Sequence, residues 1–186
     1  MTVRTTLTGV EFDSMASRGA FADIPGKIEL IDGEIRIMCP LGPIHRDYTD
    51  YLNEWSQRSC SDNSFRIRCQ NTLPTSENDR PEPDIHWVDF RRYRTRHPRP
   101  DETHLLIEVT DSSLAFDLGL KADKYAAAGI REYWVVDTRA KLIHVMTEIV
   151  DGAYSDRRVV RSGEPLSPGC KPEAMLDTAD LFSDGE

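Results

Sequence analysis

The feature that most constrains the fold is a strand–helix–strand pattern between residues 104 and 137. His104–Thr110 and Glu132–Asp137 are two apolar runs of strand length. The segment between them, Leu114–Ala128, has helical spacing and is followed by Gly129, a residue typical of helix ends. Two strands joined in this way are expected to be parallel, with a right-handed crossover. The pattern therefore predicts an α/β fold.

Further helices and strands are predicted on both sides of this βαβ unit. Alternating apolar residues around Asp-Gly dipeptides predict two hairpins, because Asp-Gly favours tight turns. Helical spacing after a capping residue or a proline predicts helices. The expected elements are a helix over Thr8–Arg18, a hairpin over Lys27–Cys39, a helix over Pro43–Arg58, strands at Phe65–Gln70 and Asp84–Val88, a hairpin pairing Lys141–Glu148 with Tyr154–Val160, and a short helix within Ala174–Phe182.

Length and composition favour one domain over residues 1–186. The 186 residues, 39% of them hydrophobic, suffice for one sizeable core, and no internal repeat or linker divides the chain. No apolar run approaches the roughly 20 residues that cross a bilayer, and the first residues lack the features of a signal peptide. A cytoplasmic protein without a membrane partner is therefore expected.

Cysteine spacing and net charge disfavour several classes of protein. The four cysteines show neither the CxxC pairs of a zinc site nor the density of a disulfide scaffold. The formal charge of −9 argues against a protein that coats nucleic acid non-specifically, because polyanions repel it at long range. A nuclease is still allowed, since its acidic site is neutralised when a cation arrives.

Two acidic residues stand at predicted strands. Glu108 lies among aliphatic residues, and a buried carboxylate is costly unless it is paired, protonated or bound to a metal. Asp84 opens the strand at 84–88, directly after Pro83. Carboxylates on neighbouring strands repel each other; a divalent cation relieves the repulsion, and oxygen ligands select Mg²⁺ or Mn²⁺ over zinc. The alternative is structural: Glu108 pairs with an arginine and Asp84 caps a turn.

A lysine, Lys121, lies on the apolar side of the predicted crossover helix. It shares that side with Ala122 and Tyr125, which must face the sheet. Either its stem covers apolar surface while the ammonium reaches solvent, or the ammonium reaches the two carboxylates and offsets phosphate charge in a transition state. Asp117, one turn earlier, is placed to orient it through an i to i+4 pair.

Together these residues carry a family resemblance. Its features are Pro83-Asp84, Glu108-Val109 at the end of an apolar strand, Asp117, Lys121, Tyr125 and the run Gly129–Asp137, with Glu29–Glu34, Pro43 and His45 upstream. They resemble the Uma-type putative restriction endonucleases, a branch of the PD-(D/E)XK nuclease superfamily. The resemblance covers most of residues 20–182 and is most specific in the βαβ half.

The resemblance implies a restriction-endonuclease-like mixed sheet flanked by helices, and a Mg²⁺-dependent phosphodiesterase that uses metal-activated water. Asp84, Glu108 and the Val109 carbonyl would be the metal ligands, and Lys121 the catalytic lysine. In the parent motif the lysine stands two residues after the acid, where this chain has Thr110. Relocation of the lysine to the next helix is the solution that this branch suggests.

Three further residues are open between a site role and a structural one. Glu34, after the tight turn, is a third carboxylate by resemblance or an exposed hairpin residue. His45 faces the site by resemblance or is a structural histidine. His86 shares the face of Asp84 by strand parity.

A basic segment follows the Asp84 strand. Its arginines alternate with tyrosine and histidine, a composition that suits phosphate contact and base stacking. The alternative is a solvated loop that keeps a sheet edge from pairing. The candidate nucleic-acid contacts are Arg91, Arg92, Arg94 and Arg96.

The predicted function is thus Mg²⁺-dependent hydrolysis of nucleic acid, DNA foremost, and double-strand cutting would favour a homodimer. Two rivals stay open: a non-catalytic nucleic-acid- or protein-binding module on the same fold, and a hydrolase of another phosphate ester.

Overall fold

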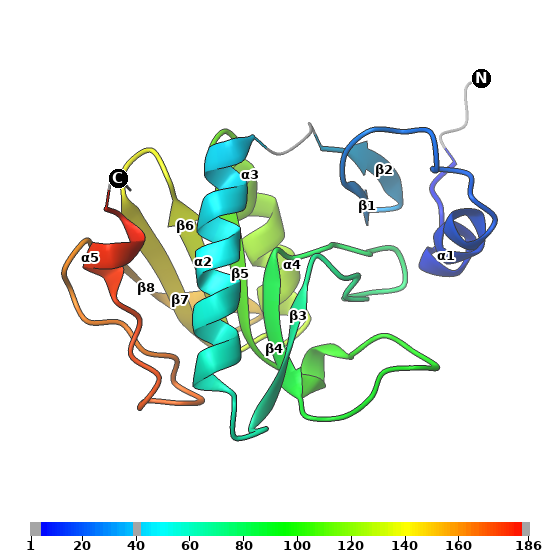
Figure 1. Ribbon diagram of the computed structural model, residues 1–186. Coiled ribbons are helices and arrows are strands. Elements are labelled where there is room, and N and C mark those ends of the chain that lie inside the picture. The colour runs from blue at the N-terminus through cyan, green and yellow to red at the C-terminus, as the bar shows by residue number, and fades with distance from the viewer. Residues whose placement is uncertain (1–4, 39–41, 184–186) are drawn as a thin grey trace.

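The computed structural model describes residues 5–38 and 42–183, and its main element is a six-stranded mixed sheet (Figure 1). The strand order is β3-β4-β5-β6-β7-β8, and β5 and β6 form the one parallel pair among these strands. The predicted parallel βαβ unit is therefore confirmed. The bounds are β3 (Phe65–Cys69), β4 (Ile85–Asp89), β5 (Thr103–Thr110), β6 (Glu132–Asp137), β7 (Leu142–Val150) and β8 (Ala153–Arg161).

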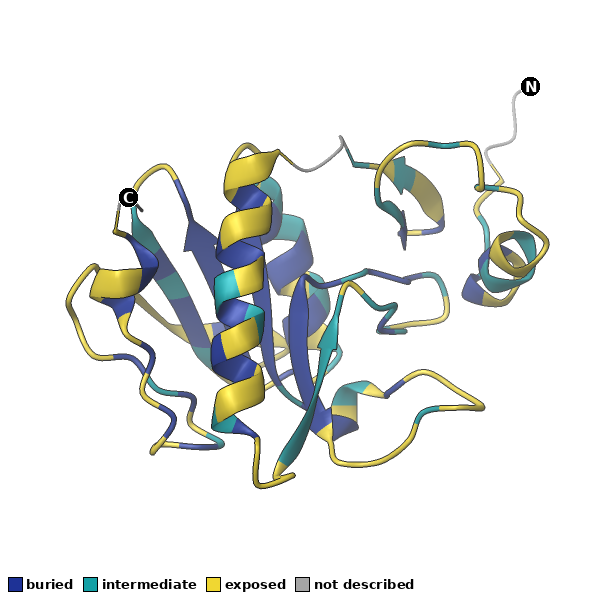
Figure 2. Ribbon diagram, viewed as in Figure 1, coloured by how far each residue is buried: buried dark blue, intermediate teal, exposed yellow. Residues whose placement is uncertain are grey.

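Helices cover both faces of this sheet, so its central strands are buried on both sides (Figure 2). On one face, α2 (Pro43–Ser59) packs Trp55 against Trp87 and Trp134. On the other face, α4 (Ala122–Ala127) packs Tyr125 edge-on against Tyr133. Double burial explains why β5 and β6 read as continuous apolar runs rather than as alternating strands.

The crossover segment is not the regular helix that was predicted for Leu114–Ala128. It consists of α3 (Leu114–Phe116), a wider π turn over Asp117–Lys121, and α4. A π turn has i to i+5 bonding and is frequent at functional sites. Here Asp117 and Lys121, the two ends of that turn, are both buried. The distortion thus directs two charged side chains inward.

The N-terminal part forms a helix and a separate two-stranded sheet, as predicted. Helix α1 (Gly9–Ser17) is capped by Thr8 through a capping box with Glu11. Strands β1 (Ile28–Ile31) and β2 (Glu34–Ile37) pair around Asp32 and Gly33, whose φ angles of 54° and 73° suit the mirror-image turn of a tight hairpin. Cys39, the predicted end of this hairpin, lies outside the described residues.

The predicted C-terminal helix is shorter than expected. Helix α5 spans only Thr178–Leu181, because Leu176 is held in extended pairing with Leu166. A 3-10 turn at Pro100–Glu102 precedes β5. Within residues 5–38 and 42–183, none of the helices combines the length and the apolar character that a membrane span requires.

Candidate active site

A cavity of about 450 Å³ lies where the end of β5, the start of β4 and the hairpin β1–β2 meet. The sheet register places Ile85 opposite Ile107, so Asp84 and Glu108 are cross-strand neighbours at that edge. The structure thus brings together the predicted acids and the predicted lysine. The cavity is lined by Lys27, Ile37, Met38, Gly42, Pro43, Ile44, His45, Asp84, Glu108, Val109, Asp111, Ser112, Ser113, Asp117 and Lys121.

Asp84 is buried and held by one of its two oxygens. Its Oδ2 accepts a hydrogen bond from the Val109 backbone N–H at 2.9 Å and lies 3.2 Å from His45 Nε2. Burial alone would raise the pKa of Asp84, but the Lys27 ammonium and the His45 imidazole bring that pKa below its ordinary value. Asp84 is therefore an oriented, ionised carboxylate.

Glu108 is also buried, and one of its oxygens receives two hydrogen bonds. Lys121 Nζ and the Tyr125 hydroxyl donate to Oε1 at 2.8 and 2.9 Å. Burial raises the pKa of Glu108 to about 7, against the opposing effect of the Lys121 and Lys27 ammonium groups. The carboxylate is thus costly to ionise until a further cation approaches.

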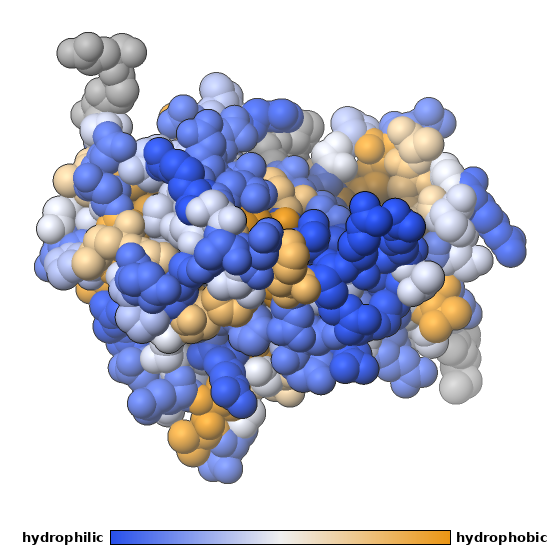
Figure 3. Space-filling model, turned by 60° about the horizontal axis from the view of Figure 1, so that its bottom comes forward, coloured by the Kyte–Doolittle hydropathy of each residue, from blue (hydrophilic) through white to orange (hydrophobic). Residues whose placement is uncertain are grey.

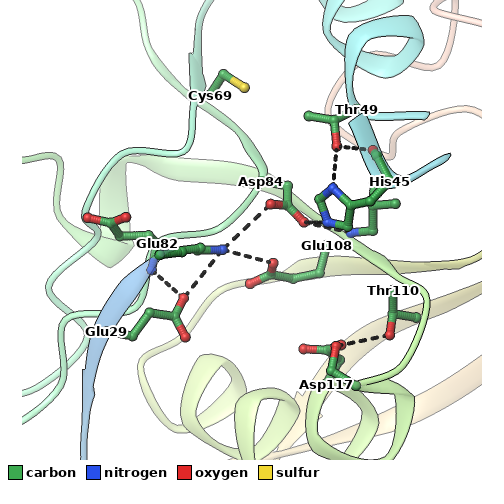
Figure 4. Close-up of polar contacts among 12 residues, drawn as sticks. Glu29, His45, Thr49, Cys69, Glu82, Asp84, Glu108, Thr110 and Asp117 are labelled. Atoms are coloured by element: carbon green, nitrogen blue, oxygen red, sulfur yellow. Dashed lines mark hydrogen bonds and ion pairs between the residues drawn. The ribbon is translucent and has the colours of Figure 1, made fainter. Parts of the chain in front are cut away.

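Asp117 supports the same lysine from the π turn. Its Oδ1 lies 3.9 Å from Lys121 Nζ, an ion pair at the predicted i to i+4 spacing. Its Oδ2 accepts a hydrogen bond from the Ser113 hydroxyl at 2.6 Å. Figure 4 shows Asp117 beside Thr110, at the side of the cluster away from Glu29.

Two charged residues of the site, Glu29 and Lys27, were missed by sequence reasoning. Glu29 is fully buried, and its Oε1 accepts from the Glu82 backbone N–H at 2.8 Å and from Lys121 Nζ at 3.2 Å. Figure 4 shows the Glu29, Asp84 and Glu108 carboxylates around one space. Period-two alternation predicts Glu29 on the solvent side of β1, opposite to Leu30, but packing of the hairpin covers both sides. The one available signal was the place of Glu29 in the family-like string Glu29–Glu34.

Two predicted neighbours do not reach the cavity. Glu34 is exposed on β2, and the third carboxylate of the cluster is Glu29 instead. His86 does share the strand face of Asp84, but it is fully buried opposite Leu106 and Arg68 and does not line the cavity. His86 lies two residues after Asp84 and therefore farther from the cavity. Strand parity predicts the face on which a side chain lies but not its distance from the site, so parity alone misplaced the histidine.

The basic segment leaves β4 at the end opposite to Asp84, roughly 20 Å along the strand. Figure 3 shows a strongly hydrophilic area on the face that carries this segment. Arg96 binds Glu102 through two nitrogens, and Arg91 Nη1 donates to Glu102 at 3.2 Å. Arg92 and Arg94 are exposed. Two of the four predicted contacts are therefore engaged in the loop itself.

The oxygen atoms at the cavity that could bind a metal suit a hard divalent cation. Asp84 Oδ1 is buried and has no hydrogen-bond partner among the described residues, and Glu108 Oε2 has only Lys27 at 3.8 Å within that part of the chain. Across residues 5–38 and 42–183, no three His, Cys, Asp or Glu side chains form a metal-binding group. A metal here would therefore take two carboxylate oxygens and complete its shell with backbone carbonyl and water oxygens, which suits Mg²⁺ or Mn²⁺.

The six-stranded mixed sheet, flanked by helices and containing the parallel βαβ unit, defines the class of restriction-endonuclease-like α/β proteins. Within this class, the chain belongs to the Uma2 family of putative restriction endonucleases, whose model matches residues 16–177. The expected family resemblance is thereby confirmed.

A solved structure shares the fold. The chain resembles a putative nuclease belonging to DUF820 from Anabaena variabilis with a TM-score of 0.69 and 15% sequence identity, over 87% of this chain and 94% of that chain. At that identity the likeness shows the fold alone. No curated protein matches the chain.

Proposed function

We propose that this chain is a Mg²⁺-dependent endonuclease that hydrolyses phosphodiester bonds of DNA. The observation that carries the proposal is the convergence of Asp84 and Glu108 on one cavity, with Lys121 Nζ 2.8 Å from Glu108. A buried ion pair alone would explain one acid and one lysine. A second ion pair, between Lys27 Nζ and Asp84 Oδ1 at 3.5 Å, offsets the charge of the second acid but leaves that oxygen without a hydrogen bond in the described part of the chain.

In this proposal Asp84, Glu108 and the Val109 carbonyl hold the cation. When bound, Mg²⁺ or Mn²⁺ polarises a phosphoryl oxygen and lowers the pKa of a water molecule. The Val109 N–H and His45 orient Asp84 through its other oxygen. Lys121, held by Glu108 and Glu29, keeps its proton and offsets negative charge that develops on the phosphate.

DNA contact is assigned in part to the basic segment. Arg92 and Arg94 are free to reach phosphates from an exposed loop, whereas Arg91 and Arg96 shape that loop through Glu102. Tyr93 lies under the guanidinium groups of Arg68, Arg91 and Arg96, with ring distances of 5.6, 5.7 and 5.6 Å. The segment is thus an ordered cationic surface in an acidic protein, which suits local attraction of a polyanion.

The test is cleavage of supercoiled plasmid in Mg²⁺, with Asp84→Asn and Lys121→Met as site variants. Both are expected to lose activity, whereas Asp123→Asn, at an exposed acid of α4 two residues after Lys121, should keep it. Circular dichroism checks that each variant is folded. Equal cleavage by all four proteins would trace the activity to a contaminant and remove the proposal. DNA binding without cleavage in Mg²⁺ or Mn²⁺ would instead support the non-catalytic binding module.

A further inference from the structure

Lys27, just before β1, places its ammonium group in the middle of the acidic cluster. Its Nζ lies 3.5 Å from Asp84 Oδ1, 3.5 Å from Glu29 Oε1 and 3.8 Å from Glu108 Oε2. The side chain is nearly buried, with 10% of its surface exposed. Three carboxylates around one ammonium make it the local counter-ion of the site.

We infer that Lys27 is an exchangeable counter-ion: its ammonium neutralises the acids while the site lacks a metal, and a divalent cation displaces it. The inference rests on the proposed function, because it concerns the same cation site. It adds a role for a residue outside the four that were predicted to hold or assist the metal, which are Asp84, Glu108, Val109 and Lys121.

Lys27 faces the carboxylate oxygens that a metal would use. Asp84 Oδ2 is engaged by Val109 and His45, and Glu108 Oε1 by Lys121 and Tyr125. The remaining oxygens, Asp84 Oδ1 and Glu108 Oε2, are those nearest to Lys27. A Mg²⁺ ion would lie about 2.1 Å from the same oxygens. Both cations cannot occupy that space, and at such short range they repel each other strongly.

The two lysines of the cluster differ in how firmly they are held. Lys121 Nζ makes hydrogen bonds of 2.8 and 3.2 Å, and its side chain is only 2% exposed. The distances from Lys27 Nζ to the three carboxylates are all 3.5 Å or longer, beyond the usual range of about 2.7 to 3.2 Å for an N–H···O bond. Among the described residues, Lys27 is therefore held by charge attraction without directional bonds, and it is the lysine that can leave.

Lys27 also has a path to solvent. It lines the same cavity as Ile37 and Ile44, which are 55% and 59% exposed. A four-carbon stem that rotates toward this rim keeps its apolar part in contact with apolar surface while the ammonium reaches water. Lys121 lines the same cavity, but hydrogen bonds to Glu108 and Glu29 hold its ammonium, and its side chain is only 2% exposed.

Amine labelling of the unmodified protein tests the displacement. The chain has five lysines, Lys27, Lys121, Lys124, Lys141 and Lys171. Limited acetylation is mapped by mass spectrometry in EDTA and in saturating MgCl₂, and Mg²⁺ binding is measured separately by calorimetry. Acetylation of Lys27 is expected to rise several-fold with Mg²⁺, while Lys121 stays protected and the partly exposed Lys124 is unchanged.

The outcomes separate the exchange of Lys27 from the proposed function. If calorimetry shows Mg²⁺ binding but Lys27 labelling stays constant or falls, the exchange does not occur and the proposed function stands. If neither Mg²⁺ nor Mn²⁺ binds, the metal site itself is refuted, and the exchange with it.

A variant gives a second, independent measurement. Lys27→Met removes the competing cation, so its affinity for Mg²⁺ should be several-fold higher than that of the wild type. Its melting temperature should fall in EDTA and recover in Mg²⁺ by more than the wild type gains. Lys124→Met, which removes a lysine of α4 that does not line the cavity, is the control and should leave Mg²⁺ affinity unchanged. An equal or lower affinity in Lys27→Met would overturn the inference.

Discussion

Lys121 Nζ donates a hydrogen bond to Glu108 Oε1 at 2.8 Å, and so joins the crossover helix to the strand that precedes it. The bond is fully buried, and the same ammonium also contacts Glu29 and Asp117. Removal of a buried ammonium leaves its partners as uncompensated charges, which costs more than the pair itself contributes. The lysine is therefore expected to stabilise the fold as well as to serve the site.

Lys121→Met should accordingly lower the free energy of unfolding by about 3 to 5 kcal/mol, measured by urea denaturation in EDTA. The double variant Glu108→Gln/Lys121→Met should lose less stability than Lys121→Met, because it also removes the carboxylate that the single variant leaves unpaired. Arg139→Met is a control at the exposed ion pair with Asp111, and should cost about 1 kcal/mol or less. Equal losses in both single variants would contradict the buried pairing.

His86 is expected to make the protein less stable at acidic pH. It is fully buried, neither ring nitrogen has a hydrogen-bond partner among the described residues, and burial together with Arg68 and His97 lowers the pKa of His86 to about 3. A lowered pKa means that the unfolded chain takes up the proton first, so the stability is complete above about pH 6.5 and is lost as pH falls toward 3.

Between pH 7 and pH 5 this histidine alone should remove about 2 kcal/mol of stability. His86→Leu should therefore show a smaller loss over that interval than the wild type, by urea denaturation at both pH values. His104→Gln, at an exposed pair with Asp89, should keep the full loss. The same pH dependence in wild type and His86→Leu would show that His86 does not titrate as a buried group.

The basic segment predicts a salt effect on DNA binding. Arg92→Gln/Arg94→Gln should weaken binding of a short duplex in EDTA and reduce the slope of log affinity against log salt by about 1 for each phosphate that is no longer neutralised. Arg157→Gln/Arg158→Gln, on the far edge strand β8, removes the same charge elsewhere and should leave the slope unchanged. Identical slopes for both double variants would remove the segment from the interface.

Gly119 lies inside the π turn, and a methyl group there would meet no atom within 4 Å apart from the neighbouring helical backbone. Gly119→Ala should raise the free energy of unfolding by about 0.4 to 1 kcal/mol, because alanine loses less conformational freedom on folding. Thermal or urea unfolding measures this. A loss of stability would mean that the wide turn requires glycine.

The cluster could be predicted in part. Asp84 and Glu108 were detectable because acids at strand positions break an apolar pattern, and Lys121 because a lysine breaks an apolar helix stripe. The π turn was not detectable, since its residues satisfy ordinary helical spacing. Glu34 was predicted from its place after the tight turn and from the family resemblance, and neither signal shows which acid of the hairpin is buried.

The sequence by itself determined the order of the main elements, the parallel βαβ unit and three charged residues of the site, Asp84, Glu108 and Lys121. These are local properties: periodicity, turn residues and a charge out of pattern can be read within one segment. Only the tertiary structure decided that Lys27 and Glu29 join the cluster and that His86 and Glu34 do not. The burial of Glu29 depends on how the β1–β2 hairpin packs against Glu82 and Lys121, some 50 to 90 residues later in the chain. No local sequence pattern specifies that packing.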